Sequence, residues 1–156
     1  MTYMITGLDP APFAGLADLD DDQLAARNVR RVVATAKPGY PCRVTLEDAE
    51  PGETLFLLSH VSHDVATPYR SLYAIYVRAG ATARAHMDDA IPPVFEGRPI
   101  ALRGFGADGM LQDARLALPG QSDAGIRALF DMPIIAYIDA HNAAHGCFAA
   151  RVERAG

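Results

Sequence analysis

Two β-strands joined by a tight turn are encoded in residues 134–153, IIAYIDAHNAAHGCFAARVE. Apolar and polar side chains alternate on both sides of residues 144–146, and Gly146 can take the positive φ that a three-residue loop requires. Such a loop places Asp139 opposite Arg151 and collects the apolar side chains on one face. The stretch therefore predicts an antiparallel hairpin with one apolar and one mixed face.

The mixed face of this hairpin carries the candidates for catalysis. In the predicted register, His141 and Cys147 share this face as diagonal neighbours, in line with Asp139. An imidazole and a carboxylate beside a thiol are the groups that activate a cysteine nucleophile. An ion pair and a small cysteine also fill the half-buried face of an ordinary sheet, so a structural interpretation stands beside the catalytic one.

A second hairpin is expected at residues 99–116, with a glycine-containing loop at its tip. The loop length lets Phe105 face Leu111 and Arg103 face Asp113, which pairs apolar with apolar and basic with acidic side chains. Tight turns of this kind require antiparallel neighbours. The sheet is therefore expected to be mainly antiparallel.

Other segments with strand-like alternation surround these hairpins. The sequence Glu-Pro-Gly-Glu at residues 50–53 predicts a type II turn, which is expected to join strands at residues 42–46 and 54–60 in a hairpin. Further strands are expected at residues 3–6, 29–34 and 73–78.

Two helices are expected, with the clearer start signal in the first. Asp20 and Gln23 have the spacing of a capping box at the start of a helix over residues 20–28. A second helix is expected over residues 122–131, before Pro133. Residues 82–98 have no clear period and are expected to wrap the surface. The whole pattern predicts one α+β domain over residues 1–156, with two or three short helices beside an antiparallel-dominated sheet.

Composition and charge exclude several classes of protein. Half of the 156 residues are hydrophobic, and the net charge is −5, so we expect an ordered globular chain that does not bind nucleic acid. The N-terminus lacks the pattern of a secretory signal, and no apolar run is long enough to span a membrane. We therefore expect a cytoplasmic protein without membrane contact, in which Cys42 and Cys147 are free thiols.

Two histidine pairs have spacings seen in metal sites, His60-x-x-His63 and His141-x-x-x-His145. His141 and His145 lie between two strand-like segments, where side chains at this spacing do not converge on one ion as they would on a helix. The pattern G-x-G-x-x-G at residues 104–109 leads into a strand rather than a helix, which excludes a dinucleotide site. We expect no metal and no cofactor.

Three segments share a further pattern: PCRVTLEDAEPGE at residues 41–53, PYR at 68–70 with AIYVR at 74–78, and HN at 141–142 followed by GCFAARVE at 146–153. Together they resemble an uncharacterised bacterial family of about this length, known only as a domain of unknown function. The resemblance implies no activity, and Asp139 and His145 lie outside its pattern. The matching positions are Cys42, Arg43, Glu47, Asp48, Tyr69, Arg70, His141, Asn142, Gly146 and Cys147.

Two functions remain open from the sequence. The first is a small-molecule pocket, which could depend on a thiol and a histidine, with Cys147, His141 and Cys42 as catalytic candidates. Arginine side chains bind carboxylates and phosphates in fixed geometry, so the ligand-binding candidates are Tyr69, Arg70 and Arg43. The alternative is a non-catalytic interaction or structural module that forms a homo-oligomer through a sheet edge or the mixed face.

Overall fold

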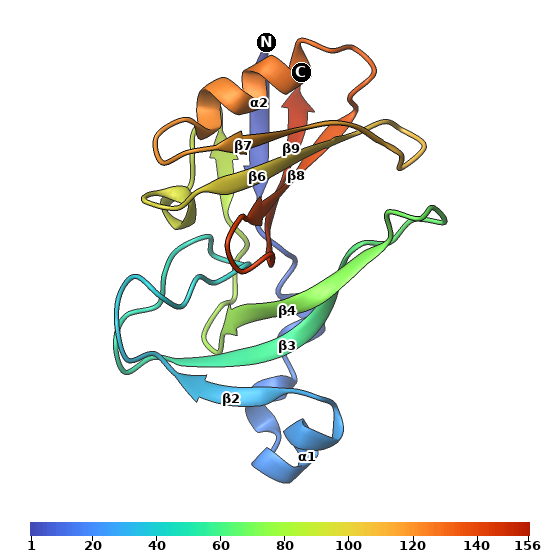
Figure 1. Cartoon of the computed structure of the whole chain (residues 1–156). Coiled ribbons are helices and arrows are strands. Elements are labelled where there is room, and N and C mark those ends of the chain that lie inside the picture. The colour runs from blue at the N-terminus through green and yellow to red at the C-terminus, as the bar shows by residue number, and fades with distance from the viewer.

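The computed structural model describes all residues from 1 to 156, and its strands form two antiparallel sheets, one above the other in Figure 1. The antiparallel α+β fold expected from the sequence is confirmed. The larger sheet has the order β5-β1-β9-β8-β6-β7, with β5 (His86–Asp88), β1 (Thr2–Thr6), β9 (Phe148–Ala155), β8 (Tyr137–Asn142), β6 (Ile100–Phe105) and β7 (Leu111–Ala117). The smaller sheet has the order β2-β3-β4, with β2 (Arg30–Val33), β3 (Thr54–His63) and β4 (Ser71–Arg78).

Helix α2 (Ser122–Phe130) covers the larger sheet, as the sequence predicted. Ile126, Leu129 and Phe130 recur at helical spacing and are buried in the main core, together with Leu102 and Ile138 from the sheet. This burial of one apolar stripe is what holds a short helix in place. None of the helices has the length and apolar character needed to cross a membrane.

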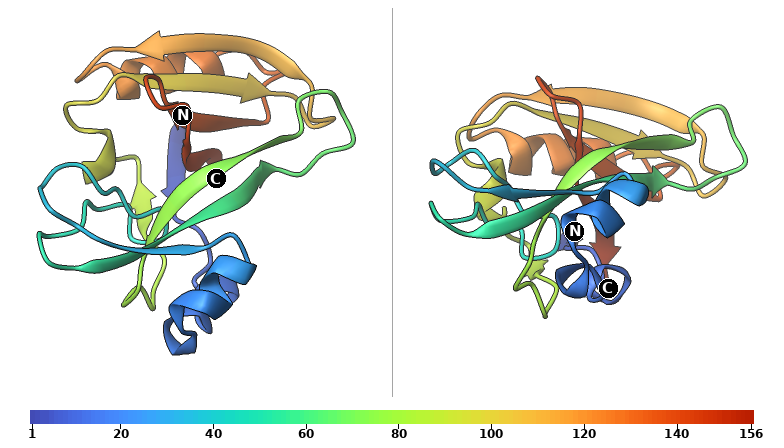
Figure 2. Two further views of the ribbon diagram at one scale, coloured as in Figure 1. Left: turned by 60° about the horizontal axis from the view of Figure 1, so that its bottom comes forward. Right: turned by 90° about the horizontal axis from the view of Figure 1, so that it is seen from below.

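Helix α1 (Asp21–Ala26) begins with the predicted capping box. The Asp20 side chain accepts the Gln23 N–H at 2.8 Å, and the Gln23 side chain accepts the Asp20 N–H at 2.9 Å. Leu24 and Phe56 belong to one small apolar cluster, which attaches the helix to the smaller sheet. Seen from below, α1 lies in front of that sheet, at the end of the molecule opposite α2 (Figure 2).

The C-terminal hairpin has the predicted register along most of its length. Asp139 faces Arg151 across β8 and β9, and Gly146 has a φ of 82°. The Arg151 guanidinium donates to both Asp139 carboxylate oxygens at 2.8 and 3.0 Å. This pairing neutralises the completely buried carboxylate of Asp139. The predicted pairing of Asp139 with Arg151 and the predicted positive φ of Gly146 are both confirmed.

The turn end of this hairpin differs from the prediction. A β-bulge in β9 makes Phe148, rather than Ala149, the partner of His141. Beyond the bulge, the Asn142 N–H donates to the Cys147 carbonyl at 2.9 Å, so Cys147 lies beside Asn142. One extra residue reverses the side-chain parity of a strand. The prediction that His141 and Cys147 share a face is therefore wrong.

A bulge also shifts the second hairpin. Phe105 faces Leu111 as predicted, but the register changes at the next pair, and Arg103 faces Ala114 instead of Asp113. The loop itself has the predicted form, because Gly109 has a φ of 79°.

Residues 42–46 do not form the predicted strand. They belong to a turn, residues 41–48, which is tied to the smaller sheet by a single bridge between Cys42 and Tyr76. The turn at residues 50–53 is present, with Glu53 N–H donating to the Glu50 carbonyl at 3.0 Å. It leads into β3 without closing a hairpin, because β2 and β4 occupy both edges of β3.

Residues 82–98 contain regular structure that the sequence did not indicate. They contain β5, which pairs with β1, and a 3₁₀ turn at Pro93–Phe95. Val94 and Phe95 of this turn are fully buried in the main core. The rest of the segment wraps the surface as expected, since only Pro92, Val94 and Phe95 of these residues are buried.

Candidate functional site

The turn at residues 41–48, which we call the Arg43 turn, bridges the two parts of the molecule. Arg43 N–H donates to the Tyr76 carbonyl of β4, and the Arg43 carbonyl accepts the Leu8 N–H, which follows β1. Leu46 has a φ of 54°, a left-handed conformation that is unfavourable for leucine. Contacts with both sheets hold the turn in this strained form and fix the position of residue 43.

The Arg43 side chain is buried without a full set of partners. It is 1% exposed, and its Nη2 donates to Cys147 Sγ at 3.2 Å. Nε and Nη1, which carry three of the five guanidinium N–H groups, have no hydrogen-bond partner. Burial lowers the pKa of Arg43, and the contact with Cys147 acts against this shift. A buried cation with free donors is costly in an isolated protein.

Asn142 completes the polar group around Cys147. Its Nδ2 donates to Cys147 Sγ at 3.5 Å, whereas its Oδ1 has no partner. Asn142 is 7% exposed. Arg43 Nε, Arg43 Nη1 and Asn142 Oδ1 are the only buried side-chain polar atoms of the chain that lack a hydrogen bond. All three belong to one small region, because both residues contact the same sulfur.

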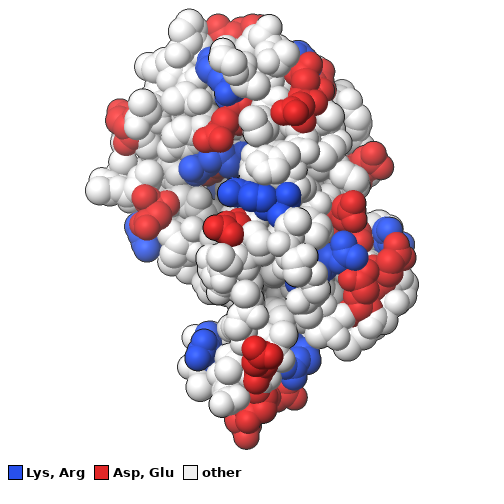
Figure 3. Space-filling view, turned by 180° about the vertical axis from the view of Figure 1, so that it is seen from behind, with Lys and Arg blue, Asp and Glu red and all other residues white.

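These residues line a cavity of about 260 Å³ between the two sheets. Arg98 also lines it, but its guanidinium donates to both oxygens of Asp48 at 2.7 and 2.9 Å. No Asp or Glu is among the lining residues. The outer face seen from behind differs, because acidic and basic side chains are interspersed on it (Figure 3). The lining residues are Gly39, Pro41, Arg43, Leu57, Tyr73, Ala74, Ile75, Tyr76, Arg98, Asn142, His145 and Cys147.

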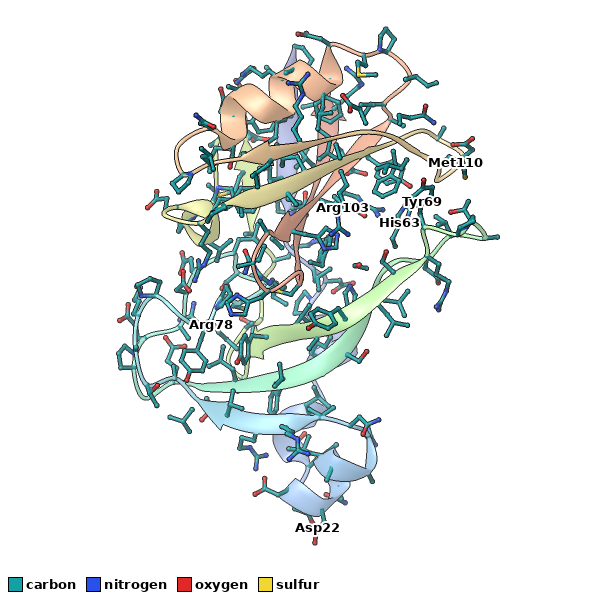
Figure 4. The ribbon with its side chains drawn as sticks, viewed as in Figure 1. Asp22, His63, Tyr69, Arg78, Arg103 and Met110 are labelled. Atoms are coloured by element: carbon teal, nitrogen blue, oxygen red, sulfur yellow. The ribbon has the colours of Figure 1, made fainter.

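A second, more open hollow of about 530 Å³ adjoins this cavity. Tyr73 of β4 and His145 of the β8–β9 loop line both. This hollow also has no Asp or Glu in its wall, and Arg103 of β6 extends toward it (Figure 4). Its lining residues are Ser62, Arg70, Ser71, Leu72, Tyr73, Arg103, His141, His145 and Gly146.

His141 belongs to the second hollow. Its Nδ1 lies 3.0 Å from the Gly146 carbonyl, and its Nε2 lies 3.4 Å from Arg103 Nη1. Burial lowers the pKa of His141, and the positive charge of Arg103 acts in the same direction. His141 is therefore neutral near pH 7, and it has no hydrogen bond to Cys147.

The structure separates the remaining sequence candidates. Cys42 is fully buried in an apolar cluster, where its sulfur accepts the Arg78 N–H at 3.3 Å. Arg70 lines the second hollow and pairs with exposed Asp64 at 3.3 Å. Tyr69 lines neither hollow; its carbonyl lies 2.9 Å from His63 Nδ1, on the side where Figure 4 labels both residues. Arg43 and Cys147 are the two candidates that come together.

Several residues of the two hollows were missed in the sequence. Asn142 lies in a segment that the family resemblance marked, but nothing indicated its role. No sequence pattern marked Tyr73, Arg98 or Arg103 as site residues, because their positions depend on contacts between distant segments. No three His, Cys, Asp or Glu side chains come together as metal ligands would.

A family model described as "Protein of unknown function (DUF1203)" matches residues 39–154. This range contains Arg43, Arg103, Asn142 and Cys147, and so both hollows. No curated protein and no solved structure matches the chain.

Proposed function

The chain belongs to the family described as protein of unknown function (DUF1203), which names no activity, and we propose from the geometry that it binds a small organic anion in the cavity at Arg43. The observation that carries this proposal is the buried guanidinium with three unpartnered N–H groups. An anionic oxygen would supply both the missing acceptors and the opposite charge. Arg43 is one of the residues that line the cavity.

The wall of the cavity supports an anion rather than a cation. The chain has 19 Asp and Glu residues against 14 Lys and Arg, but no carboxylate lines this cavity. Asp48 lies close by, but both of its carboxylate oxygens already accept hydrogen bonds from Arg98. The positive charge of Arg43 is therefore left for a bound molecule.

The remaining wall suggests how the rest of the ligand is held. Asn142 Oδ1 is a free acceptor, which suits a hydroxyl or ammonium group of the ligand. Leu57, Tyr73 and Tyr76 provide apolar and aromatic surface for a short carbon skeleton. Cys147 lines the same cavity, and its sulfur contacts Arg43 and Asn142 rather than His141. The proposal therefore does not include a catalytic pair of Cys147 and His141.

Isothermal titration calorimetry at low ionic strength tests the proposal with a panel of small carboxylic acids and phosphate esters. We expect Arg43→Met to weaken binding at least about tenfold, because hydrogen bonds to charged groups contribute about 1.5–3 kcal/mol. Arg43→Lys keeps the charge with fewer donors and should bind with intermediate affinity. Arg115→Met is the matched control, because Arg115 is exposed on β7 and lines neither hollow.

Circular dichroism and thermal melting establish that each variant is folded. A folded wild-type protein that binds no acid of the panel would overturn the proposal. If that protein also self-associates in size-exclusion chromatography, the homo-oligomeric module becomes the better interpretation.

A further inference from the structure

We propose that the ligand carries two anionic groups, one bound at Arg43 and the other at Arg103 in the adjoining hollow. This inference rests on the proposed function, because it extends the same ligand from the cavity into the second hollow. Tyr73 and His145 line both spaces, so the two hollows are neighbours. A ligand that extends past these two side chains would reach both arginines.

Arg103 has no acidic partner, although an acid faces it in the sheet. Asp139 lies opposite Arg103 across β6 and β8. Both oxygens of Asp139 accept hydrogen bonds from Arg151, on the β9 side. The only side-chain hydrogen bond of Arg103 is a long one, 3.4 Å from Nη1 to His141 Nε2. Arg103 therefore has no ion pair within the chain.

The four arginines of the two hollows divide into two kinds. Arg98 and Arg70 each pair with a carboxylate, Asp48 and Asp64. Arg43 and Arg103 have none, and one of them lies in each hollow. Neither wall contains an Asp or Glu that could take the place of a ligand. Two separate unneutralised charges match a ligand with an anionic group at each end.

His141 supports the second position without adding a charge. Its Nδ1 is fixed by the Gly146 carbonyl, which leaves Nε2 to face Arg103. A neutral imidazole can accept an N–H group and hold the guanidinium in place. His141 is therefore a positioning residue for Arg103 rather than a partner for Cys147.

Calorimetry with matched pairs of acids tests this inference. Straight-chain dicarboxylates from four to eight carbons are compared with monocarboxylates of the same length, at low salt. At one length or more, we expect the dicarboxylate to bind at least about tenfold more tightly. Arg103→Met should reduce the affinity for the dicarboxylate to that of the monocarboxylate, whereas Arg115→Met should change neither. A parallel series of mono- and bisphosphate esters separates carboxylate from phosphate recognition.

The outcomes distinguish this inference from the proposed function. If monocarboxylates or phosphate monoesters bind at Arg43 but the doubly charged compounds bind no more tightly, the second anionic position is wrong and the proposed function stands. Equal weakening of singly and doubly charged ligands by Arg103→Met would also overturn it. If the wild-type protein binds neither series, the proposed function itself fails.

Discussion

The two cysteines differ in what surrounds each sulfur. Cys147 is partly exposed at the cavity wall, and its sulfur receives N–H groups from Arg43 and Asn142. Cys42 is fully buried beside Ile75 and Val77. Both are free thiols, as expected. The chain therefore contains one thiol that reports on the cavity and one that serves as an internal control.

Alkylation with iodoacetamide should modify Cys147 in the folded protein and leave Cys42 unmodified, because a reagent can reach only the first sulfur. A saturating acid that binds at Arg43 should slow the reaction, since it occupies the space beside Cys147. Mass spectrometry of peptides after timed labelling measures both rates. Modification of Cys42 at the same rate, or no protection by a ligand that calorimetry shows to be bound, would contradict this expectation.

Among the elements, the Arg43 turn depends on a close approach that only glycine permits. A Cβ atom at Gly7 would lie 1.9 Å from the Val44 carbonyl oxygen. Ala85 N–H donates to the same carbonyl at 2.9 Å, and its own carbonyl accepts the Gly7 N–H. Three segments far apart in sequence thus meet at the base of the turn.

Gly7→Ala should lower the free energy of unfolding by about 1–3 kcal/mol, because the new methyl group must displace backbone. Gly15→Ala is the matched control. Its Cβ would meet nothing within 4 Å, and its φ is −80°, so the change should be within about 0.5 kcal/mol. Urea denaturation measures both. Equal midpoints for the two variants would show that the Arg43 turn does not depend on this contact.

The strands and helices could be predicted because their signals are local. Alternation identified eight of the nine strands, and Asp20 with Gln23 identified the start of α1. The pairing of Asp139 with Arg151 followed from loop parity and from the cost of an unpaired buried carboxylate.

The site could not be predicted, because its parts are placed by features without a local signal. The bulge at Ala149 lies in an alanine-rich run that gives no sign of an extra residue, yet it moves Cys147 away from His141. Residues 42–46 alternate like a strand but are held as a turn by distant contacts. The contact between Arg43 and Cys147 joins positions 104 residues apart.

At the scale of the whole molecule, half-buried His60 and buried His141 make stability depend on pH. Burial lowers the pKa values of His60 and His141 below the usual 6.5. The unfolded chain then binds more protons than the folded one below that pH. The stability that these groups contribute is present above about pH 6.5 and is lost as the pH falls through the folded pKa values.

The free energy of unfolding should therefore decrease from pH 7.5 to pH 5.5, and His60→Gln should make this decrease smaller. Carboxylates such as Glu53 and Asp123, whose pKa values are lowered by hydrogen bonds from Arg78 and Arg127, lose their contribution at lower pH. Urea denaturation at several pH values measures the slope. A slope that is the same in wild type and His60→Gln would show that His60 does not contribute.

The smaller sheet is formed by a segment inserted between β1 and β5 of the larger sheet, which we call the inserted segment. The inserted segment begins after β1 and ends before β5, and the hydrogen bond from the Gly7 N–H to the Ala85 carbonyl joins its two ends. Arg43 belongs to the inserted segment, whereas Asn142 and Arg103 belong to the larger sheet and Cys147 to its β8–β9 loop. A ligand held by both sets of residues would act as a removable cross-link between two parts that share few covalent connections. Binding of this ligand would therefore restrict the motion of the inserted segment relative to the larger sheet.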